Sequence, residues 1–336
     1  MKRLTPLLLV LLTALSCTRQ DRYIQFTGYA QGGTYSVKLN LGGIPGRIRR
    51  HPERIRAGVD SILTLVDTTL SGYNKRSQLS RFNAGEPVES GGIFKEIYSM
   101  TRNFYDETDG ALDMAAGPLF DAWGFGFTTD SLPSGAVVDS LLGVCGMDKL
   151  DGNMHATVPG VRPKLNFNAI AQGYTCDLVA DYLHALGAED MLVDIGEIYC
   201  DGVNPSGKPW SIGVDRPVDG NMTPGADLDG VWLSDGSARG VVTSGNYRKF
   251  YVKDGRKYSH TIDPRTGYPV SHSLLSATVV APTAAAADAY ATYCMVIGLE
   301  AARSFILSRP DLEGYLIYDR EGVMAEWASD GFTLRR

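Results

Sequence analysis

Two oxygen-bearing side chains stand four residues apart in an alanine-rich stretch that runs from Ala284 to Thr292. On a helix, residues four apart project from the same face, so the Asp288 carboxylate and the Thr292 hydroxyl would be neighbours. Such oxygens suit a hard cation such as Mg²⁺. In a purely structural alternative, Thr292 bonds to its own helix and Asp288 faces solvent. The small alanine side chains would let another group approach closely, and both interpretations stay open.

A second candidate is His260, which leads through Thr261 into the turn Ile262-Asp263-Pro264-Arg265-Thr266-Gly267. The unperturbed pKa of histidine, roughly 6.5, suits a base that works near neutral pH. A histidine beside a turn rich in proline and glycine is more often structural. By itself this segment therefore leaves the role of His260 open.

Two further segments suggest a ligand. Asn166-Phe167-Asn168-Ala169-Ile170-Ala171-Gln172-Gly173 would place a helix N-terminus after Asn168, and such a terminus is a natural phosphate site. Gly173 in the first turns costs about 1 kcal/mol relative to alanine, which indicates that bulk is excluded there by packing or by a ligand. The stretch from Gly110-Ala111-Leu112-Asp113 to Trp123-Gly124-Phe125-Gly126 is either a turn with core aromatics or one wall of a pocket for a flat ring.

The elements that must position these residues alternate between short strands and helices. Apolar spacing predicts helices over 49–70 and 94–108, around 139–142, from near Asn168 to Gly187, and from the residue after Thr283 through Ile297. Strands are predicted over 23–27 and 34–41, joined by a turn at Gly32-Gly33, and over 191–195, 210–215, 240–243, 249–252 and 276–280. We expect an α+β fold, a single large domain of mixed or antiparallel sheets with packed helices. The strand order cannot be derived from these patterns.

The first residues predict the compartment. Lys2 and Arg3 precede an almost wholly apolar run from Leu4 to Leu15, and small residues then lead to Cys17. This pattern is typical of a lipoprotein signal peptide, and the run is shorter than the roughly 20 residues that a membrane span needs. We expect a signal peptide over 1–17, a linker over 18–24 and the domain over 25–336. Cys17 would carry the lipid, with the body outside the cytoplasm.

The composition narrows the class of protein. The formal net charge is −6 with no lysine or arginine run, which argues against a nucleic-acid surface. Apolar residues make up 44% of the chain, enough for a real core. Beyond Cys17, none of the cysteines is paired at the CxxC spacing of a zinc site. An oxidising compartment would permit disulfides, and buried free thiols are the alternative.

The order of these segments resembles the ApbE family, the FAD:protein FMN transferases. The resemblance rests on motifs along nearly the whole mature chain, which are Gly32-Gly33-Thr34-Tyr35, Ser71-Gly72-Tyr73, Ser77-Gln78-Leu79-Ser80-Arg81-Phe82-Asn83, Gly110-Ala111-Leu112-Asp113, Gly117-Pro118-Leu119, Trp123-Gly124-Phe125-Gly126, Ala169-Ile170-Ala171-Gln172-Gly173-Tyr174, Thr243-Ser244-Gly245-Asn246-Tyr247-Arg248, His260 to Gly267 and Ala287 to Thr292. So many blocks in one order are very unusual by chance.

The resemblance implies a set of site residues. Mg²⁺ would be held by Asp288, Thr292 and the main-chain carbonyl of Ala169, and His260 would be the catalytic base. FAD, as a substrate, would contact Gly32, Tyr73, Ala111, Leu112, Asp113, Asn166, Gln172 and Ile262.

The chain departs from its relatives at several of these positions. Asn166 and Gln172 stand where relatives commonly carry charge, and Ala291 stands where some have a second carboxylate. One glycine of the usual pair before Glu197 is missing, which would tighten or distort that turn. These departures bear on cofactor affinity and on activity.

The implied activity is Mg²⁺-dependent transfer of FMN from FAD to a Thr or Ser hydroxyl of a client protein, with release of AMP. The implied clients are flavin-carrying subunits of membrane redox complexes, such as the Na⁺-translocating NADH dehydrogenase and the Rnf complex. A lipid-anchored protein on the periplasmic face of a bacterial membrane fits this role. The alternatives are a Mg²⁺-dependent FAD pyrophosphatase, with water as the acceptor, and a lipoprotein that binds FAD without turnover.

Overall fold

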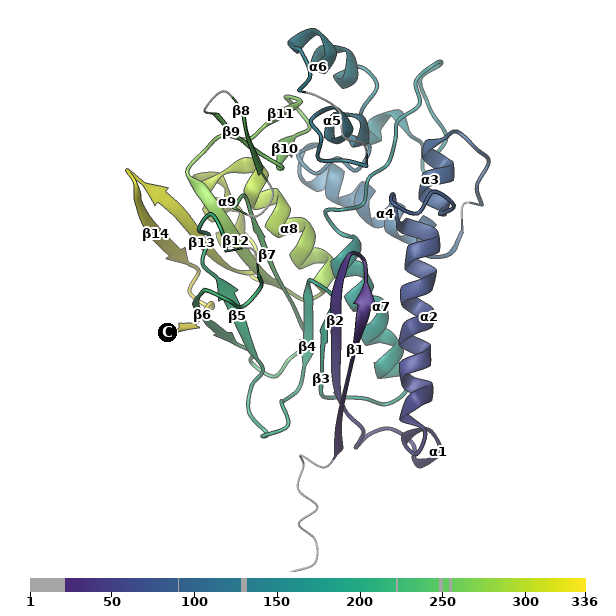
Figure 1. Cartoon of the computed structure of the whole chain (residues 1–336), viewed down its shortest axis with the longest axis vertical. Helices are drawn as coiled ribbons and strands as arrows, with labels where there is room; N and C mark the ends of the chain where they lie inside the picture. The colour runs from purple at the N-terminus through teal and green to yellow at the C-terminus, as the bar shows by residue number, and fades with distance from the viewer. Residues whose placement is uncertain (1–21, 90, 128–131, 222, 248–249, 254–255) are drawn as a thin grey trace, which may run out of the picture.

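The computed structural model describes residues 22–89, 91–127, 132–221, 223–247, 250–253 and 256–336 (Figure 1). Its centre is an eight-stranded sheet in the order β1-β2-β3-β4-β7-β12-β13-β14, in which all neighbours are antiparallel. The strands of this sheet are β1 Tyr23–Ala30, β2 Gly33–Asn40, β3 Met191–Asp194, β4 Ile198–Asp201, β7 Arg239–Gly245, β12 Leu274–Ala281, β13 Glu313–Arg320 and β14 Val323–Ala328. The predicted α+β class is confirmed.

Three smaller antiparallel sheets accompany the large one. A three-stranded sheet has the order β15-β6-β5, and two hairpins pair β8 with β9 and β10 with β11. These strands are β5 Ser211–Asp215, β6 Leu228–Leu233, β8 Phe250–Lys253, β9 Arg256–Ser259, β10 Ile262–Asp263, β11 Tyr268–Pro269 and β15 Leu334–Arg335.

In the described parts of the chain, the helices after residue 170 pack against one face of the large sheet, whereas most of the earlier helices lie toward one end of the molecule (Figure 1). The helices in these parts are α1 Gly46–Arg49, α2 Pro52–Leu70, α3 Gln78–Asn83, α4 Gly92–Glu107, α5 Gly117–Ala122, α6 Gly135–Leu142, the 3₁₀ turn Met147–Lys149, α7 Ala171–Ala185, α8 Ala284–Ile297 and α9 Leu299–Leu307.

Alternation along the strands divides the core between the two faces of the large sheet. Val242 and Val279 pack with residues of α8, whereas their neighbours Val241 and Val280 pack with Trp232 of the three-stranded sheet. Successive residues of a strand point to opposite faces, so β7 and β12 are apolar on both. This double burial holds β7 and β12 firmly beneath α8.

Two predicted helix starts are wrong. The helix predicted over 49–70 is interrupted, and α2 begins at Pro52 because proline disfavours helical geometry at the residue before it, His51. The helix predicted from Asn168 begins at Ala171, since the main-chain N–H groups of Ile170 and Ala171 both bond to the Phe167 carbonyl in a tight turn. The turn over Asn168 to Ile170 therefore precedes α7.

The first hairpin turns one residue earlier than predicted. Ala30 pairs with Gly33, so the turn residues are Gln31 and Gly32, with φ of 50° and 81°. Two successive left-handed residues are typical of a type I′ hairpin turn. Glycine adopts this conformation freely, while Gln31 is held in it by a 2.6 Å hydrogen bond from its Nε2 to Thr175 Oγ1 on α7. The hairpin tip is thereby fixed to the start of α7.

Candidate functional site

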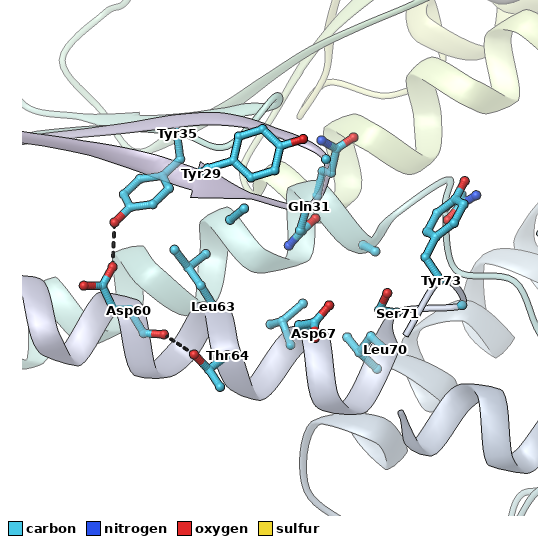
Figure 2. A pocket seen from close by; sticks show the side chains of 17 residues that line it. Tyr29, Gln31, Tyr35, Asp60, Leu63, Thr64, Asp67, Leu70, Ser71 and Tyr73 are labelled. Carbon is cyan, nitrogen blue, oxygen red and sulfur yellow. Dashed lines mark hydrogen bonds between the residues drawn. The ribbon is translucent and has the colours of Figure 1, made fainter. Parts of the chain in front are cut away.

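A trench with a cavity volume of about 830 Å³ runs between the β1–β2 hairpin and α2 and ends at the start of α7 (Figure 2). Three of the predicted FAD contacts, Gly32, Tyr73 and Gln172, line it. Asn168 and Ala171, on either side of the turn that contains Ala169, also line it. The structure therefore brings together residues from three distant parts of the sequence at one end of this trench.

Tyr73 and Gln172 occupy this end in different ways. The Tyr73 side chain is 68% exposed, and its ring meets Phe127 edge-on at 5.1 Å between centroids. An exposed ring with one edge supported can still offer a face to a flat ligand. Gln172 Nε2 donates to the Ile195 carbonyl at 3.1 Å, which positions its side chain beside the turn between β3 and β4.

That turn closes with a single glycine. Gly196 has φ of +91°, and its N–H donates to Asp194 Oδ1 at 3.2 Å. A Cβ at Gly196 would come within 2.3 Å of Gln172 Nε2. The missing second glycine therefore leaves an ordered turn, and the glycine that remains makes room for Gln172.

Asn166 links two of the predicted segments. Its main-chain N–H donates to the Met114 carbonyl at 2.7 Å, and its Oδ1 accepts from the Asn168 N–H at 2.9 Å. The amide side chain thus supports the turn that leads into α7. An uncharged residue can make this bond because only an acceptor oxygen is needed.

Ala111, Leu112 and Asp113 are buried, so their side chains belong to the core beside this link. Asp113 Oδ1 accepts from the N–H groups of Ala115 at 2.8 Å and Met147 at 3.2 Å. Burial raises the pKa of the Asp113 carboxyl to about 6, against the lowering effect of these two bonds. The Asp113 carboxyl therefore stabilises the loop in which it lies. A ligand beside Ala111–Asp113 would contact their main-chain groups.

This burial predicts a pH dependence of stability. Between the ordinary pKa of 3.8 and the folded value of about 6, the folded protein holds a proton at Asp113 that the unfolded chain has released. The free energy of unfolding should therefore fall by up to about 3 kcal/mol as the pH rises through this window. Asp113→Asn keeps an oxygen for both N–H groups and should remove this part of the decline. Urea unfolding at pH 4.5 and pH 7 measures it, and an equal decline in both proteins would contradict it.

The starts of α7 and α8 cap each other. Asp288 Oδ2 on α8 accepts from the Gly173 N–H at 3.1 Å, and Asp177 on α7 accepts from the N–H groups of Ala284 and Ala285 at 2.8 Å each. Each carboxylate thus satisfies amides that a helix start leaves unbonded. Asp177 was not among the predicted site residues, although its spacing of four from Gly173 places both on one helix face.

Gly173 is required for this crossing. A Cβ there would lie 2.3 Å from the Ala284 carbonyl oxygen and 2.9 Å from the Ala285 nitrogen, both main-chain atoms. Packing against α8 therefore accounts for the exclusion of bulk at this position.

We expect Gly173→Ala to lower the free energy of unfolding by at least about 2 kcal/mol, because the main chain of α8 must move. Gly46→Ala is the matched control, since nothing lies within 4 Å of its added Cβ, and it should change stability by less than about 1 kcal/mol. Urea unfolding of both variants tests this. Equal stabilities would mean that the two helices separate at little cost.

The oxygen donors around Asp288 fit a hard cation. Asp288 is buried, which raises the pKa of its carboxyl, and Thr292 lies one turn further along the same face of α8. Thr292 Oγ1 lies 3.4 Å from Ser244 Oγ. A nearby cation would offset the cost of burying the carboxylate. In the described ranges no group of three or more His, Cys, Asp and Glu residues could hold a metal ion. The predicted metal ligands are of another kind, because only Asp288 among them is a carboxylate, and the other two are the Thr292 hydroxyl and the Ala169 carbonyl.

His260 and Ile262 are not among the residues that line the trench, and they lie beside the aromatic-glycine segment. The imidazole of His260 meets the Phe125 ring edge-on at 6.3 Å between centroids, and Ile262 is buried in one cluster with Ala116 and Trp123. Trp123 Nε1 donates to the Gly267 carbonyl at 2.8 Å. Trp123 of the aromatic-glycine segment is therefore core packing that fixes the turn after His260.

The Asp263 carboxylate is held by Arg265. Its Oδ1 accepts from Arg265 Nε and its Oδ2 from Arg265 Nη2, each at 2.9 Å. A bidentate pair of this kind fixes the Pro264–Gly267 turn. The side chain of Asp263 thereby serves the turn itself.

The remaining predictions concern cysteines and the membrane. Cys145, Cys176, Cys200 and Cys294 are buried and free, which decides between disulfides and thiols. No helix within the described ranges is long and apolar enough to cross a membrane. Cys17 and the predicted signal peptide lie outside the described residues.

Several known proteins resemble this chain along nearly its whole length. The chain is 32% identical to an FAD:protein FMN transferase of Haemophilus influenzae, over 99% of this chain and 98% of that protein. It resembles the solved structures of flavin transferase ApbE from Vibrio cholerae and of the apo flavinyl transferase ApbE from Pseudomonas stutzeri, both with a TM-score of 0.77. These two are 29% and 32% identical, cover 92% of this chain, and are themselves covered to 97% and 95%. The ApbE family model matches residues 31–316, and the chain therefore belongs to the ApbE family.

Proposed function

We propose that this protein transfers FMN from FAD to a hydroxyl side chain of a client protein. One observation carries the proposal: the trench with Gly32, Tyr73 and Gln172 reaches the start of α7, and the next residue of α7, Gly173, is bonded to the buried carboxylate of Asp288. The names of the relatives described above agree with this activity. A nucleotide in the trench would thus lie beside a buried carboxylate and a helix start.

The reaction is a displacement at phosphorus. The client hydroxyl oxygen forms a bond to the FMN phosphorus of FAD, the bond between that phosphorus and the bridging oxygen breaks, and AMP leaves. The positive end of the α7 dipole lies at Ala171 and favours the diphosphate. His260 would accept the hydroxyl proton as a general base.

Asp288, Thr292 and the Ala169 carbonyl would hold Mg²⁺, as the oxygen donors of this region allow. When bound, the metal would neutralise diphosphate charge and favour the leaving oxygen. The reciprocal caps of Asp288 and Asp177 keep α7 and α8 in contact, so Ala169 and Asp288 stay in one place relative to each other. This chain's own residues thereby arrange the phosphate end of the substrate.

Ring recognition would be divided between the trench and the buried segment beside it. Tyr73 and Gly32 would contact the part of FAD in the trench. Main-chain groups of Ala111, Leu112 and Asp113, with Asn166 and Ile262, would contact the part beyond it. Gln172 and Asn166 would contact FAD through hydrogen bonds from their uncharged amide side chains.

Incubation of the detergent-solubilised full chain with FAD, Mg²⁺ and a soluble flavin-acceptor domain, followed by intact-mass analysis, tests the proposal. The expected result is an acceptor heavier by one FMN residue, with the adduct lost in EDTA. Free FMN and AMP without an adduct would replace the transferase by a hydrolase. Bound and unchanged FAD would leave a carrier.

We also propose that Cys17 carries a lipid that anchors the protein at the periplasmic face of a bacterial membrane. The apolar run before Cys17 supports this, and the expected clients are flavin-carrying subunits of membrane redox complexes of the Na⁺-translocating NADH dehydrogenase and Rnf types. Metabolic labelling with a fatty acid should mark the native chain, and Cys17→Ser should abolish the label. A labelled Cys17→Ser protein would exclude this anchor.

A further inference from the structure

We propose that the end of the trench formed by Tyr35, Asp60 and Thr64, together with Tyr29 between this end and the hairpin turn, binds the segment of the client protein that carries the acceptor hydroxyl. This inference rests on the proposed function, and it names a surface that the FAD contacts leave unused. The occupant would be an extended peptide segment rich in hydrogen-bond donors. Its main-chain N–H groups and any basic side chain would face the trench.

The trench is longer than the predicted FAD contacts require. Along α2 its lining extends from Asp60 to Leu70, a rise of about 15 Å at 1.5 Å per residue. Tyr73 and Gln31, the residue before Gly32 in the hairpin turn, lie toward the Leu70 end, whereas Tyr35 and Asp60 lie at the opposite end (Figure 2). At about 3.3 Å per residue, such a length matches four or five extended residues. A hydroxyl carried by this segment could therefore reach the cofactor end from the Asp60 end.

The negative charge of Asp60 favours a peptide over a nucleotide at this end of the trench. The charged residues among the described residues that line the trench are Asp60 and Asp67, both acidic; Asp60 lies at this end, and Asp67 lies nearer Leu70 (Figure 2). The diphosphate of FAD carries negative charge and would be repelled there. Arg56 lies 3.7 Å from Asp60 in a half-exposed ion pair on α2, but it does not line the trench. The Asp60 end thus favours a neutral or basic occupant.

The side chains at this end can accept hydrogen bonds, so they favour an occupant that carries hydrogen-bond donors. The Tyr35 hydroxyl donates to Asp60 Oδ1 at 2.6 Å, and the Thr64 hydroxyl donates to the Asp60 carbonyl at 2.8 Å. Because each hydroxyl already donates its one hydrogen to Asp60, it can act only as an acceptor toward a bound segment. Further along, Asp67 Oδ2 accepts from Asn74 Nδ2 at 2.7 Å and has further acceptor capacity. Main-chain N–H groups or a lysine or arginine side chain would satisfy these acceptors.

The upper wall of the trench suits an extended segment. β1 is the terminal strand of the eight-stranded sheet, and the Tyr29 side chain near its end is 74% exposed. Terminal strands recruit extended peptides through main-chain hydrogen bonds. The Thr27 carbonyl on β1 already accepts from Arg56 Nη2 at 3.2 Å, which shows that this edge faces donors on α2. Tyr29 would pack on the bound segment, as exposed tyrosines do in binding surfaces.

Steady-state kinetics of the full chain tests this, with FAD and a soluble flavin-acceptor domain of the Rnf type as the probe. We expect Asp60→Lys and Tyr29→Ala each to raise the KM for the acceptor domain about three- to tenfold, a typical effect of one partly exposed contact. The KM for FAD should change less than about twofold. Asp106→Lys introduces the same change of charge on the exposed surface of α4 and should leave both KM values unchanged. The effect of Asp60→Lys should also weaken as salt is added.

An unchanged KM for the acceptor in both variants would overturn the inference, and so would a raised KM for FAD, which would place the nucleotide at this end. Tyr29→Ala keeps the test valid if loss of the Tyr35 partner unfolds Asp60→Lys. Direct binding of the acceptor domain, measured by calorimetry, separates this inference from the proposed function. Binding lost in Asp60→Lys without any FMN transfer by the wild type would support the surface and refute the transferase.

Discussion

Asp288→Ala should lower kcat/KM for FMN transfer by about 10³-fold or more. The substitution removes the single carboxylate of the predicted metal site, and charge stabilisation by a bound metal is typically worth several kcal/mol. It also removes the cap on the Gly173 N–H, so part of the loss would come from a displaced α7. Initial rates over a range of FAD concentrations from below to above KM, at several Mg²⁺ concentrations, measure the effect.

Asp288→Asn separates the two contributions. The amide oxygen can still accept from Gly173, while the charge that attracts the cation is gone. Its melting temperature should stay close to that of the wild type, but addition of Mg²⁺ should no longer raise it. Asp181→Asn, an exposed position on α7, is the control and should respond to Mg²⁺ normally. A Mg²⁺ response in Asp288→Asn equal to the wild type would refute the metal assignment.

His260→Ala should lower the rate of FMN transfer by about 10²–10⁴-fold, the usual contribution of a general base. Its affinity for FAD, followed by flavin fluorescence, should change little, because the predicted base acts on the client hydroxyl. The imidazole of His260 contacts the Phe125 ring, so the position of the imidazole depends on the aromatic-glycine segment. Phe125→Ala should therefore reduce the rate by a smaller factor.

The pH dependence of the rate provides a further check on His260. A base that titrates in the neutral range produces a fall in rate on the acid side, and His260→Ala should lose that limb. His155→Ala, an exposed histidine in the loop after the 3₁₀ turn, serves as the control. Full activity of His260→Ala across this range would remove the residue from the role of base.

Local patterns allowed several parts of the site to be predicted. The spacing of Asp288 and Thr292 placed both on one face of a helix, and α8 over Ala284–Ile297 begins after Thr283 and ends before Gly298, as predicted. Helix periodicity and caps act within a few residues, so the sequence carries their full signal. The alternative in which Asp288 faces solvent was decided only by the tertiary structure, which buries Asp288 and most of the alanines around it.

Contacts between distant segments could not be predicted. Nothing in the sequence near Asp177 indicates that its carboxylate caps α8 more than 100 residues later, because such a bond depends on how two helices cross. The same is true of the trench, whose walls come from a hairpin and a helix joined by the turn of α1. Even the start of α7 was decided by the Phe167 carbonyl and the support of Asn166 rather than by the propensity of Asn168.

The sequence by itself therefore determined the family motifs, the α+β class and the chemical nature of the candidate groups, since residue types and short spacings are local properties. The tertiary structure alone decided the strand order, the reciprocal capping of α7 and α8, and the placement of β1 at the sheet edge beside α2. Pairing and packing of distant segments are selected by the total burial of apolar surface, which no short stretch of sequence specifies.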